Sequence, residues 1–279
     1  KKALKKGDST RLTGAEIIAA INDEYNSTAD VRNPVWDALY ARNDGVNTDD
    51  TPTNINWHPT HDSAYFSSVD LSANVPFLVS TGNLRGNLHT AEALAIARQN
   101  GNGSRALIFG GSPFADLDQP RYQRHGTASG DMQALMENSL EWVLQTDPSV
   151  GTLNVVIAHT QGYYWFPYEQ GTEGWFADHV ENASLTARGT CEGAALAACL
   201  ENADLLLIGT ELTADEDEVA IIRAVENFQA AGGAVIVQHS DHFTRLSSQL
   251  MSNYGLAALS NTSQSREVSA VKYGDSLAK

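Results

Sequence analysis

Residues 203–239 read ADLLLIGTELTADEDEVAIIRAVENFQAAGGAVIVQH and predict a strand, a helix and a second strand in succession. Leu205–Ile208 and Ala234–Val237 are short, continuous apolar runs, which are typical of strands covered on both faces of a sheet. Between them, the capping sequence Thr213-Ala-Asp-Glu216 opens a helix expected over 214–231, and Gly232-Gly233 ends it. Such a unit indicates parallel strands joined by a right-handed crossover.

The same alternation extends toward the N-terminus. Further apolar runs predict strands at Val75–Ser80, Ala106–Phe109 and Leu153–Ala158. We expect helical segments among these runs at 89–99, 130–145 and 192–201. The repeated alternation predicts an α/β fold with a doubly wound parallel sheet.

Residues 75–279 are expected to form this α/β domain. Residues 1–74 are expected to form an N-terminal extension that packs on it within one globular unit. The extension holds a helix after the capping box Thr13-Gly-Ala-Glu16, and the polar segment 26–74 is expected to be mostly loop.

The charge balance excludes several classes of partner. The 279 residues include 18 Lys and Arg against 34 Asp and Glu, which gives a formal net charge of −16. A surface this acidic repels phosphate backbones and anionic lipid, so we expect no nucleic-acid partner. No stretch approaches the roughly 20 apolar residues that a membrane-spanning helix needs, so we expect no membrane insertion.

The two cysteines, Cys191 and Cys199, leave two interpretations open. A single helix through both would separate them by about 12 Å, which is beyond the reach of a disulfide. A disulfide therefore requires Cys191 to lie in a loop before the helix, which the preceding Arg188-Gly-Thr190 permits. The alternative is a pair of buried thiols.

In an open α/β sheet, ligands bind beyond the carboxyl ends of the strands. The residues at the five predicted ends are polar or glycine: Gly82-Asn83, Gly110-Gly111-Ser112, His159-Thr160-Gln161, Thr210-Glu211 and His239-Ser240-Asp241-His242. We expect His159, Glu211 and His239 to share one crevice. The candidate catalytic residues are these three together with Ser240, Asp241 and His242. The alternative is that strand ends are simply polar loops.

Cofactor and metal signals are weak. Gly110-Gly111-Ser112 is followed by Pro113 and lacks the lysine of a phosphate-binding loop, and we expect no cofactor. His58 with His61, and His239 with His242, are candidate metal ligands. However, the sequence contains no HExxH helix, so an ordinary hydrogen-bonded role is the alternative and no metal is expected.

Aromatic side chains concentrate just past the strand end at His159. The sequence there reads Tyr163-Tyr164-Trp165-Phe166-Pro167-Tyr168, and Trp175-Phe176 follows shortly after. Exposed aromatic faces stack on sugar rings and supply large contact area. The candidate glycan-binding residues are Tyr163, Tyr164, Trp165, Tyr168 and Trp175. The alternative is that these rings cover a sheet edge as ordinary packing.

Residues 203–240, with their Gly-Gly…His239-Ser240 ending, resemble the class I glutamine amidotransferase-like fold, which is flavodoxin-like. The resemblance is strongest to the trehalose-utilisation-type branch and covers roughly residues 75–242. In the amidotransferases this strand ends in a turn that carries a cysteine flanked by glycines. Here the turn reads Gln238-His239-Ser240-Asp241, and no histidine follows His242. The resemblance therefore implies a retained fold and a lost amidotransferase reaction.

A second resemblance rests on three segments: Ile55-Asn-Trp-His58-Pro-Thr-His61-Asp62, Val79-Ser-Thr-Gly-Asn83 and Arg105-Ala-Leu-Ile-Phe-Gly-Gly-Ser112-Pro-Phe. Together they are similar to the N-terminal region of large secreted bacterial zinc metallopeptidases. These are the immunomodulating metalloprotease-like enzymes, which cleave mucin-type glycoproteins and carry their catalytic HExxH helix in a separate C-terminal domain.

This second resemblance implies a non-catalytic accessory domain that contributes to recognition of a glycoprotein or glycan. Its neighbour would be the C-terminal catalytic domain of the same parent, and its location secreted, periplasmic or at the cell surface. Two alternatives remain. One is a hydrolase that uses His239, Ser240, Asp241 and His242 with help from Glu211 or His159. The other is a structural spacer with no ligand.

Overall fold

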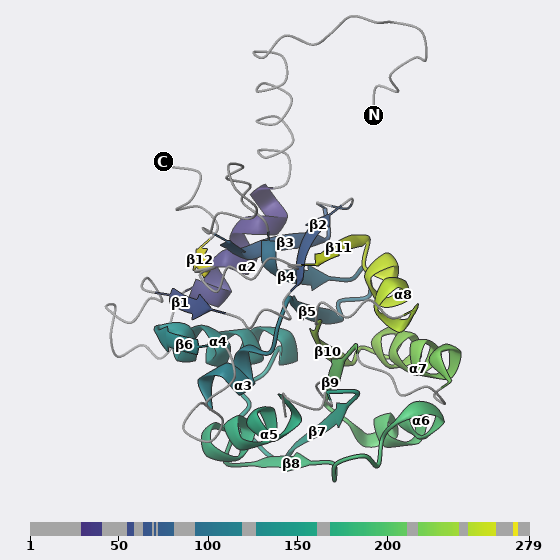
Figure 1. The fold of residues 1–279 in the computed structure, drawn as a ribbon. Coiled ribbons are helices and arrows are strands. Elements are labelled where there is room, and N and C mark those ends of the chain that lie inside the picture. Colours follow the sequence, from purple (N-terminus) through teal and green to yellow (C-terminus); the bar gives the residue numbers. More distant parts are fainter. Residues whose placement is uncertain are drawn as a thin grey trace, which may run out of the picture.

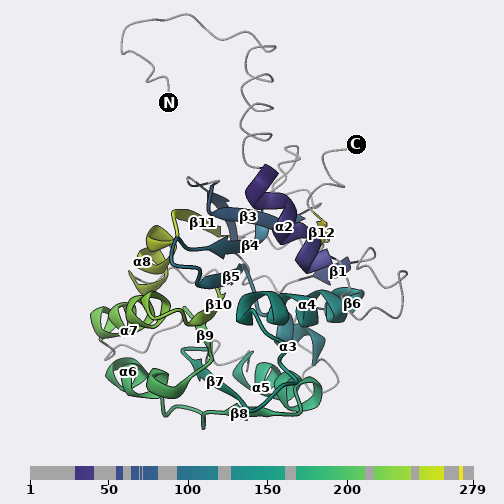
Figure 2. The same cartoon turned by 180° about the vertical axis from the view of Figure 1, so that it is seen from behind.

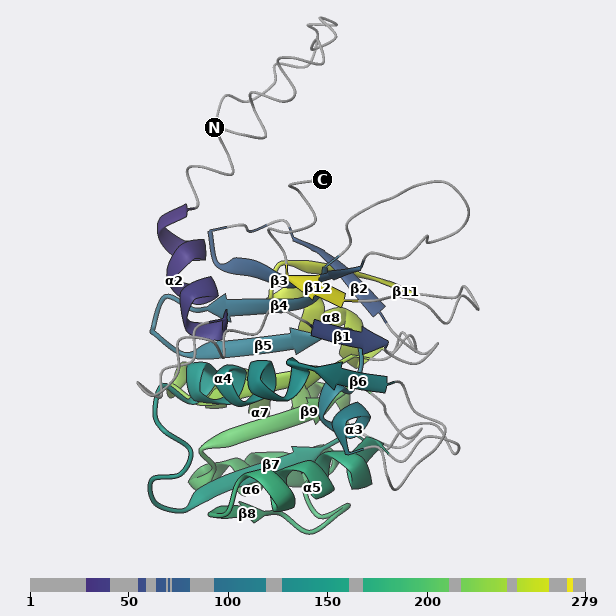
Figure 3. The same cartoon turned by 90° about the vertical axis from the view of Figure 1, so that its left-hand side faces the viewer.

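The computed structural model describes residues 29–40, 55–58, 64–68, 70, 72–80, 93–118, 127–160, 168–210, 217–239, 245–260 and 270–272. These residues form one extended sheet between two layers of helices (Figure 1). The view from behind in Figure 2 and the side view in Figure 3 show the same layers.

One half of the sheet is parallel, as the sequence predicts. Its strands lie side by side in the order β5 (Arg105–Phe109), β10 (Ala234–Gln238), β9 (Leu205–Gly209), β7 (Leu153–Ala158) and β8 (Ala183–Leu185). Every residue of β9 and β10 is buried, because apolar side chains pack on both faces.

The other half is antiparallel, so the prediction of a doubly wound parallel sheet holds for only part of the structure. The antiparallel strands are β4 (Ala93–Gln99), β3 (Asn74–Ser80), β2 (Ala64–Ser68), β11 (Leu256–Ser260) and β12 (Ala270–Lys272). β4 joins the two halves, because it pairs antiparallel with β5 and also contacts β2 and β3. Among the described residues the sheet is mixed and has ten strands.

Two sequence predictions are wrong in this antiparallel half. The helix expected over 89–99 is replaced in its described part by β4, whose first five residues are buried. Alanine favours helices, but the small side chains of β4 fit a strand covered on both faces, and tertiary packing overrides the local preference.

The segment 26–74, expected to be mostly loop, contains α2 (Ala29–Tyr40), β1 (Ile55–His58) and β2. β1 forms a separate two-stranded ribbon with β6 (Thr127–Gly130). The helix expected after Thr13 lies outside the described residues.

The helices form two layers, which Figure 3 shows on either side of the sheet. The first layer contains α2, α3 (Pro113–Leu117), α4 (Met132–Leu144) and α5 (Tyr168–His179). The second contains α6 (Leu196–Cys199) with its flanking 3-10 turns η2 (Gly193–Ala195) and η3 (Leu200–Asn202), α7 (Glu218–Ala230) and α8 (Arg245–Asn253). In the part of the chain that the structure describes, none of these helices has the length and apolar character needed to cross a membrane.

Two of the expected helices, α4 and α7, can be compared with the structure in detail. α4 lies within the helical segment expected at 130–145, and it buries an apolar face that consists of Met132, Leu135, Met136, Leu140 and Val143. α7 ends before Gly232, as expected, and this glycine has a φ of 97° that other residues rarely adopt. Its N-cap is Asp217 rather than Thr213, because the Asp217 carboxylate accepts hydrogen bonds from the backbone N–H groups of Val219 and Ala220, each at 3.1 Å.

Cys191 and Cys199 form a disulfide with their Cα atoms 5.9 Å apart. Cys191 lies before the helical turn that begins at Gly193, which is the condition that the sequence set for a bridge. The disulfide therefore ties the loop before η2 to the end of α6.

Candidate functional site at the carboxyl edge of the sheet

Buried polar residues gather where the parallel strands end. β5, β10, β9 and β7 run in the same direction, so their carboxyl ends meet at one edge. The buried polar residues that end or follow these strands are Ser112, Gln238, His239, Thr210, His159 and Thr160. His159 and His239 thus reach the same edge, with β9 between their strands. Glu211, Ser240, Asp241 and His242 lie outside the described residues, so the shared crevice stays a prediction.

His159 is held by contacts on both ring nitrogens. Its Nε2 accepts a hydrogen bond from the backbone N–H of Gly193 at 3.3 Å, and its Nδ1 lies 2.7 Å from a carboxylate oxygen of Glu192. This pattern assigns the proton to Nδ1. While these contacts hold, neither ring nitrogen is open to take a proton from a nucleophile.

Glu192 is a site residue that the sequence reasoning missed. Burial raises the pKa of its carboxyl, but the hydrogen bonds that it accepts from the His159 ring and from the His159 backbone N–H outweigh burial. The net result is a pKa below the ordinary value. Glu192 follows the disulfide-bonded Cys191 directly, so the disulfide helps to fix the carboxylate against His159.

The backbone turn at His159 packs closely against the end of the neighbouring strand β9. His159 adopts a φ of 53°, which is uncommon for a residue with a side chain. Gly209, at the end of the neighbouring β9, faces this turn. A Cβ atom at Gly209 would overlap the His159 carbonyl oxygen and lie 2.9 Å from the Thr160 Cα, so only glycine fits here.

His239 is also part of the core. Its backbone N–H donates to the Phe109 carbonyl at 2.8 Å, which continues the pairing of β10 with β5. The residue is 1% exposed, and its ring meets the ring of Phe66 edge-on, with centroids 5.9 Å apart. The described histidines at this edge therefore serve packing and hydrogen bonding rather than presenting a base to solvent.

Two buried neutral side chains at this edge lack a hydrogen-bond partner among the described residues. Gln238 and Thr160 are each 4% exposed, and among the described residues neither the Gln238 amide nor the Thr160 Oγ1 has a hydrogen-bond partner. Gln238 pairs in register with Phe109 and Gly209, which places its side chain on the face covered by α3 and α5. A glutamine that ends an apolar run gives no sequence signal of such burial.

Of the five aromatic candidates, the structure describes only Trp175 and the position of Tyr168. Trp175 is 1% exposed, packs edge-on against Phe114 with centroids 4.7 Å apart, and donates its indole N–H to Gln133 at 2.9 Å. Its ring is a core ring and cannot stack on a sugar, which corrects its place among the glycan-binding candidates. Tyr168 begins α5, and Tyr163, Tyr164 and Trp165 lie outside the described residues.

The metal candidates gain no support. His58 ends β1 in the small ribbon, a different sheet from the one that leads to His239, while His61 and His242 lie outside the described residues. Within the described ranges no group of three or more His, Cys, Asp or Glu residues is arranged to hold a metal ion. Next to His58, the buried Trp57 donates to the buried Asp116 at 2.8 Å, which ties β1 to α3.

The family comparison bears on the second sequence resemblance. A family model described as the immunomodulating metalloprotease N-terminal domain matches residues 51–263, which is well over half of the chain. No curated protein and no solved structure matches, so the amidotransferase-like assignment stays a prediction. The matched range includes β1 and every strand of the parallel half of the sheet. The chain therefore belongs to the family of immunomodulating metalloprotease N-terminal domains and is one domain of a larger metalloprotease.

Proposed function

We propose that this chain is a non-catalytic accessory domain of a secreted metalloprotease and that its carboxyl edge contributes to recognition of glycoprotein substrates. The family membership supports the parent enzyme. The engagement of both His159 ring nitrogens and the burial of His239 support a domain without its own hydrolytic site.

The observation that carries the glycan part is that the buried polar groups of Gln238 and Thr160 have no hydrogen-bond partner among the described residues. A buried polar group without a partner costs about 1–3 kcal/mol, so such groups are retained where a ligand or ordered water completes them. An amide and a hydroxyl together offer donors and acceptors without charge, which suits the hydroxyl groups of a sugar. The aromatic segment that begins at Tyr163 follows Thr160 closely, and it would supply a stacking surface at the same edge.

The test replaces Gln238 with methionine, which has a similar shape and no hydrogen-bonding amide. We expect Gln238→Met to weaken binding of a mucin-type glycopeptide, measured by calorimetry, by about tenfold. The melting temperature should stay unchanged or rise, because an unpaired polar group leaves the interior. Gln249→Met, on the exposed side of α8, is the matched control.

Three results would count against the proposal. Equal glycopeptide binding by the Gln238→Met variant and its control would remove the edge as the binding site. No glycopeptide binding by the unchanged chain would favour a structural spacer. Turnover of an amide, ester or peptide substrate that disappears in His239→Ala or Ser240→Ala would favour the hydrolase.

A further inference from the structure

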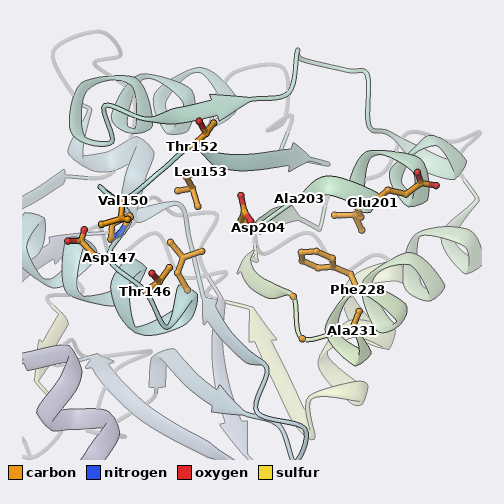
Figure 4. A pocket seen from close by; sticks show the side chains of 15 residues that line it. Thr146, Asp147, Val150, Thr152, Leu153, Glu201, Ala203, Asp204, Phe228 and Ala231 are labelled. Carbon is orange, nitrogen blue, oxygen red and sulfur yellow. The ribbon is translucent and has the colours of Figure 1, made fainter.

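An open cavity of about 400 Å³ lies at the amino edge of the parallel strands, opposite the edge discussed above (Figure 4). It is formed where three strands begin: Leu153 starts β7, Asp204 precedes β9, and Gly232-Gly233 precede β10. The chain that leads from α4 to β7 supplies one side. The cavity is therefore separate from the proposed glycan edge.

The cavity has an apolar floor and an exposed apolar side chain at its rim. Leu153, Leu200 and Phe228 are buried and line it, which gives a hydrophobic base. Val150 at the rim is 74% exposed, and it is the more exposed of the two large apolar side chains that the described residues leave in solvent. An exposed apolar group beside an apolar depression is typical of a contact surface.

The ionisable groups around this floor are all acidic. Asp147, Glu201 and Asp204 line the cavity, and the lining residues include no lysine, arginine or histidine. In Figure 4, Asp204 lies between Asp147 and Glu201. Hence no basic side chain of the lining neutralises these carboxylates.

Two of the carboxylates are held in place. Asp204 accepts hydrogen bonds from the backbone N–H and the side-chain amide of Asn154, at 2.8 and 3.2 Å. Asp147 accepts bonds from the hydroxyl and the backbone N–H of Ser149, which lower its pKa and keep it ionised. The negative charge of Asp147 also acts on a neighbouring carboxyl. The pKa of Glu141 is raised first by burial and then by Asp147.

We infer that this acidic cavity docks a basic segment from the rest of the parent metalloprotease. A lysine or arginine side chain combines an aliphatic stem, which fits against Leu153 and Phe228, with a cationic end for Asp147 and Asp204. A second copy of this chain is a poorer occupant, because each copy carries a net charge of −16 and the two would repel. The inference rests on the family membership and is independent of glycan binding.

The first experiment is zero-length carbodiimide cross-linking of the full-length parent protease, followed by peptide mass spectrometry. This reagent joins a carboxylate to a lysine amine only where the two are in contact. We expect Asp147, Glu201 or Asp204 to be joined to a lysine outside residues 1–279. Cross-links only to lysines of a second copy of this chain, or none from these three residues, would overturn the inference.

The second experiment measures association between this chain and the separately produced remainder of the parent. We expect Asp147→Asn with Asp204→Asn to weaken that association by about tenfold or more and to reduce its salt dependence. Val150→Ser should weaken it with the salt dependence unchanged. The matched control is Asp37→Asn, an exposed carboxylate on α2.

Melting curves for each variant show whether the fold is retained. Equal affinity of the paired aspartate variant and the Asp37→Asn control would refute docking at this cavity. Because glycopeptide binding is measured separately on the isolated chain, either proposal can fail without the other.

Discussion

Replacing Trp175 with alanine tests whether the aromatic residues after β7 are core or binding surface. Trp175 is 1% exposed, and its indole contacts the rings of Phe114, Phe176 and His179, with centroids 4.7, 5.2 and 5.2 Å away. Truncating a buried tryptophan to alanine costs about 3–5 kcal/mol, which includes the cavity left behind. For a chain of 279 residues, such a loss should lower Tm by about 5–9 °C.

The assay is urea unfolding and calorimetric melting of the unchanged chain, Trp175→Ala and Trp175→Phe. The phenylalanine variant keeps an aromatic ring against Phe114 but loses the bond to Gln133, so it should lose only about 1–2 kcal/mol. The reasoning is refuted if Trp175→Ala remains within about 1 kcal/mol of the unchanged chain while losing glycopeptide binding. In that case the ring would be exposed and the packing of α5 would differ from the structure.

Three further predictions concern the surroundings of His159. Replacing both Cys191 and Cys199 with serine opens a short loop with a sequence separation of 8, so stability should fall by about 2–3 kcal/mol. Reductant should shift the urea midpoint of the unchanged chain but not of this variant. Gly209→Ala should destabilise by about 1–3 kcal/mol or more, because the new Cβ meets backbone. Gly101→Ala, with open space around it, should be nearly neutral in the same melting assay. Because the folded-state pKa of Glu192 is lowered from 4.5, its contribution to stability is present above that pH and is lost as pH falls through the lowered value. Glu192→Gln should therefore flatten the acid limb of stability against pH, and an unchanged acid limb would contradict the assigned contact.

The β9, α7 and β10 unit could be predicted because its signals are local. A continuous apolar run, an acidic first turn and Gly232-Gly233 lie within 37 residues of sequence, and each acts on its own neighbours. The antiparallel half could not be predicted in the same way. Phe66 on β2 pairs with Ala258 on β11, which lies far along the chain. β4 is a strand because other parts of the fold pack on both of its faces. No local sequence pattern predicts either arrangement.

The candidate site follows the same division. The sequence predicts His159 and His239 at one edge, because strand ends are visible as the points where apolar runs stop. The residues that contact these two histidines cannot be inferred from the sequence. Glu192 reaches His159 from a loop far along the chain, and Phe66 reaches His239 from β2. Whether a histidine is free or engaged depends on such distant contacts, which are set by the fold.

The pairing of β2 with β11 has a consequence for synthesis of the protein. On the ribosome, β2 emerges early, but its partner β11 emerges only after β5, β7, β9 and β10. The parallel half can assemble first, while β2 waits with an unpaired edge that is open to wrong pairing. Closing this half requires a contact between distant parts of the chain, and such contacts form slowly. A polypeptide cut before Leu256 would leave that edge permanently unpaired, so such a truncation should aggregate even though its parallel half is complete.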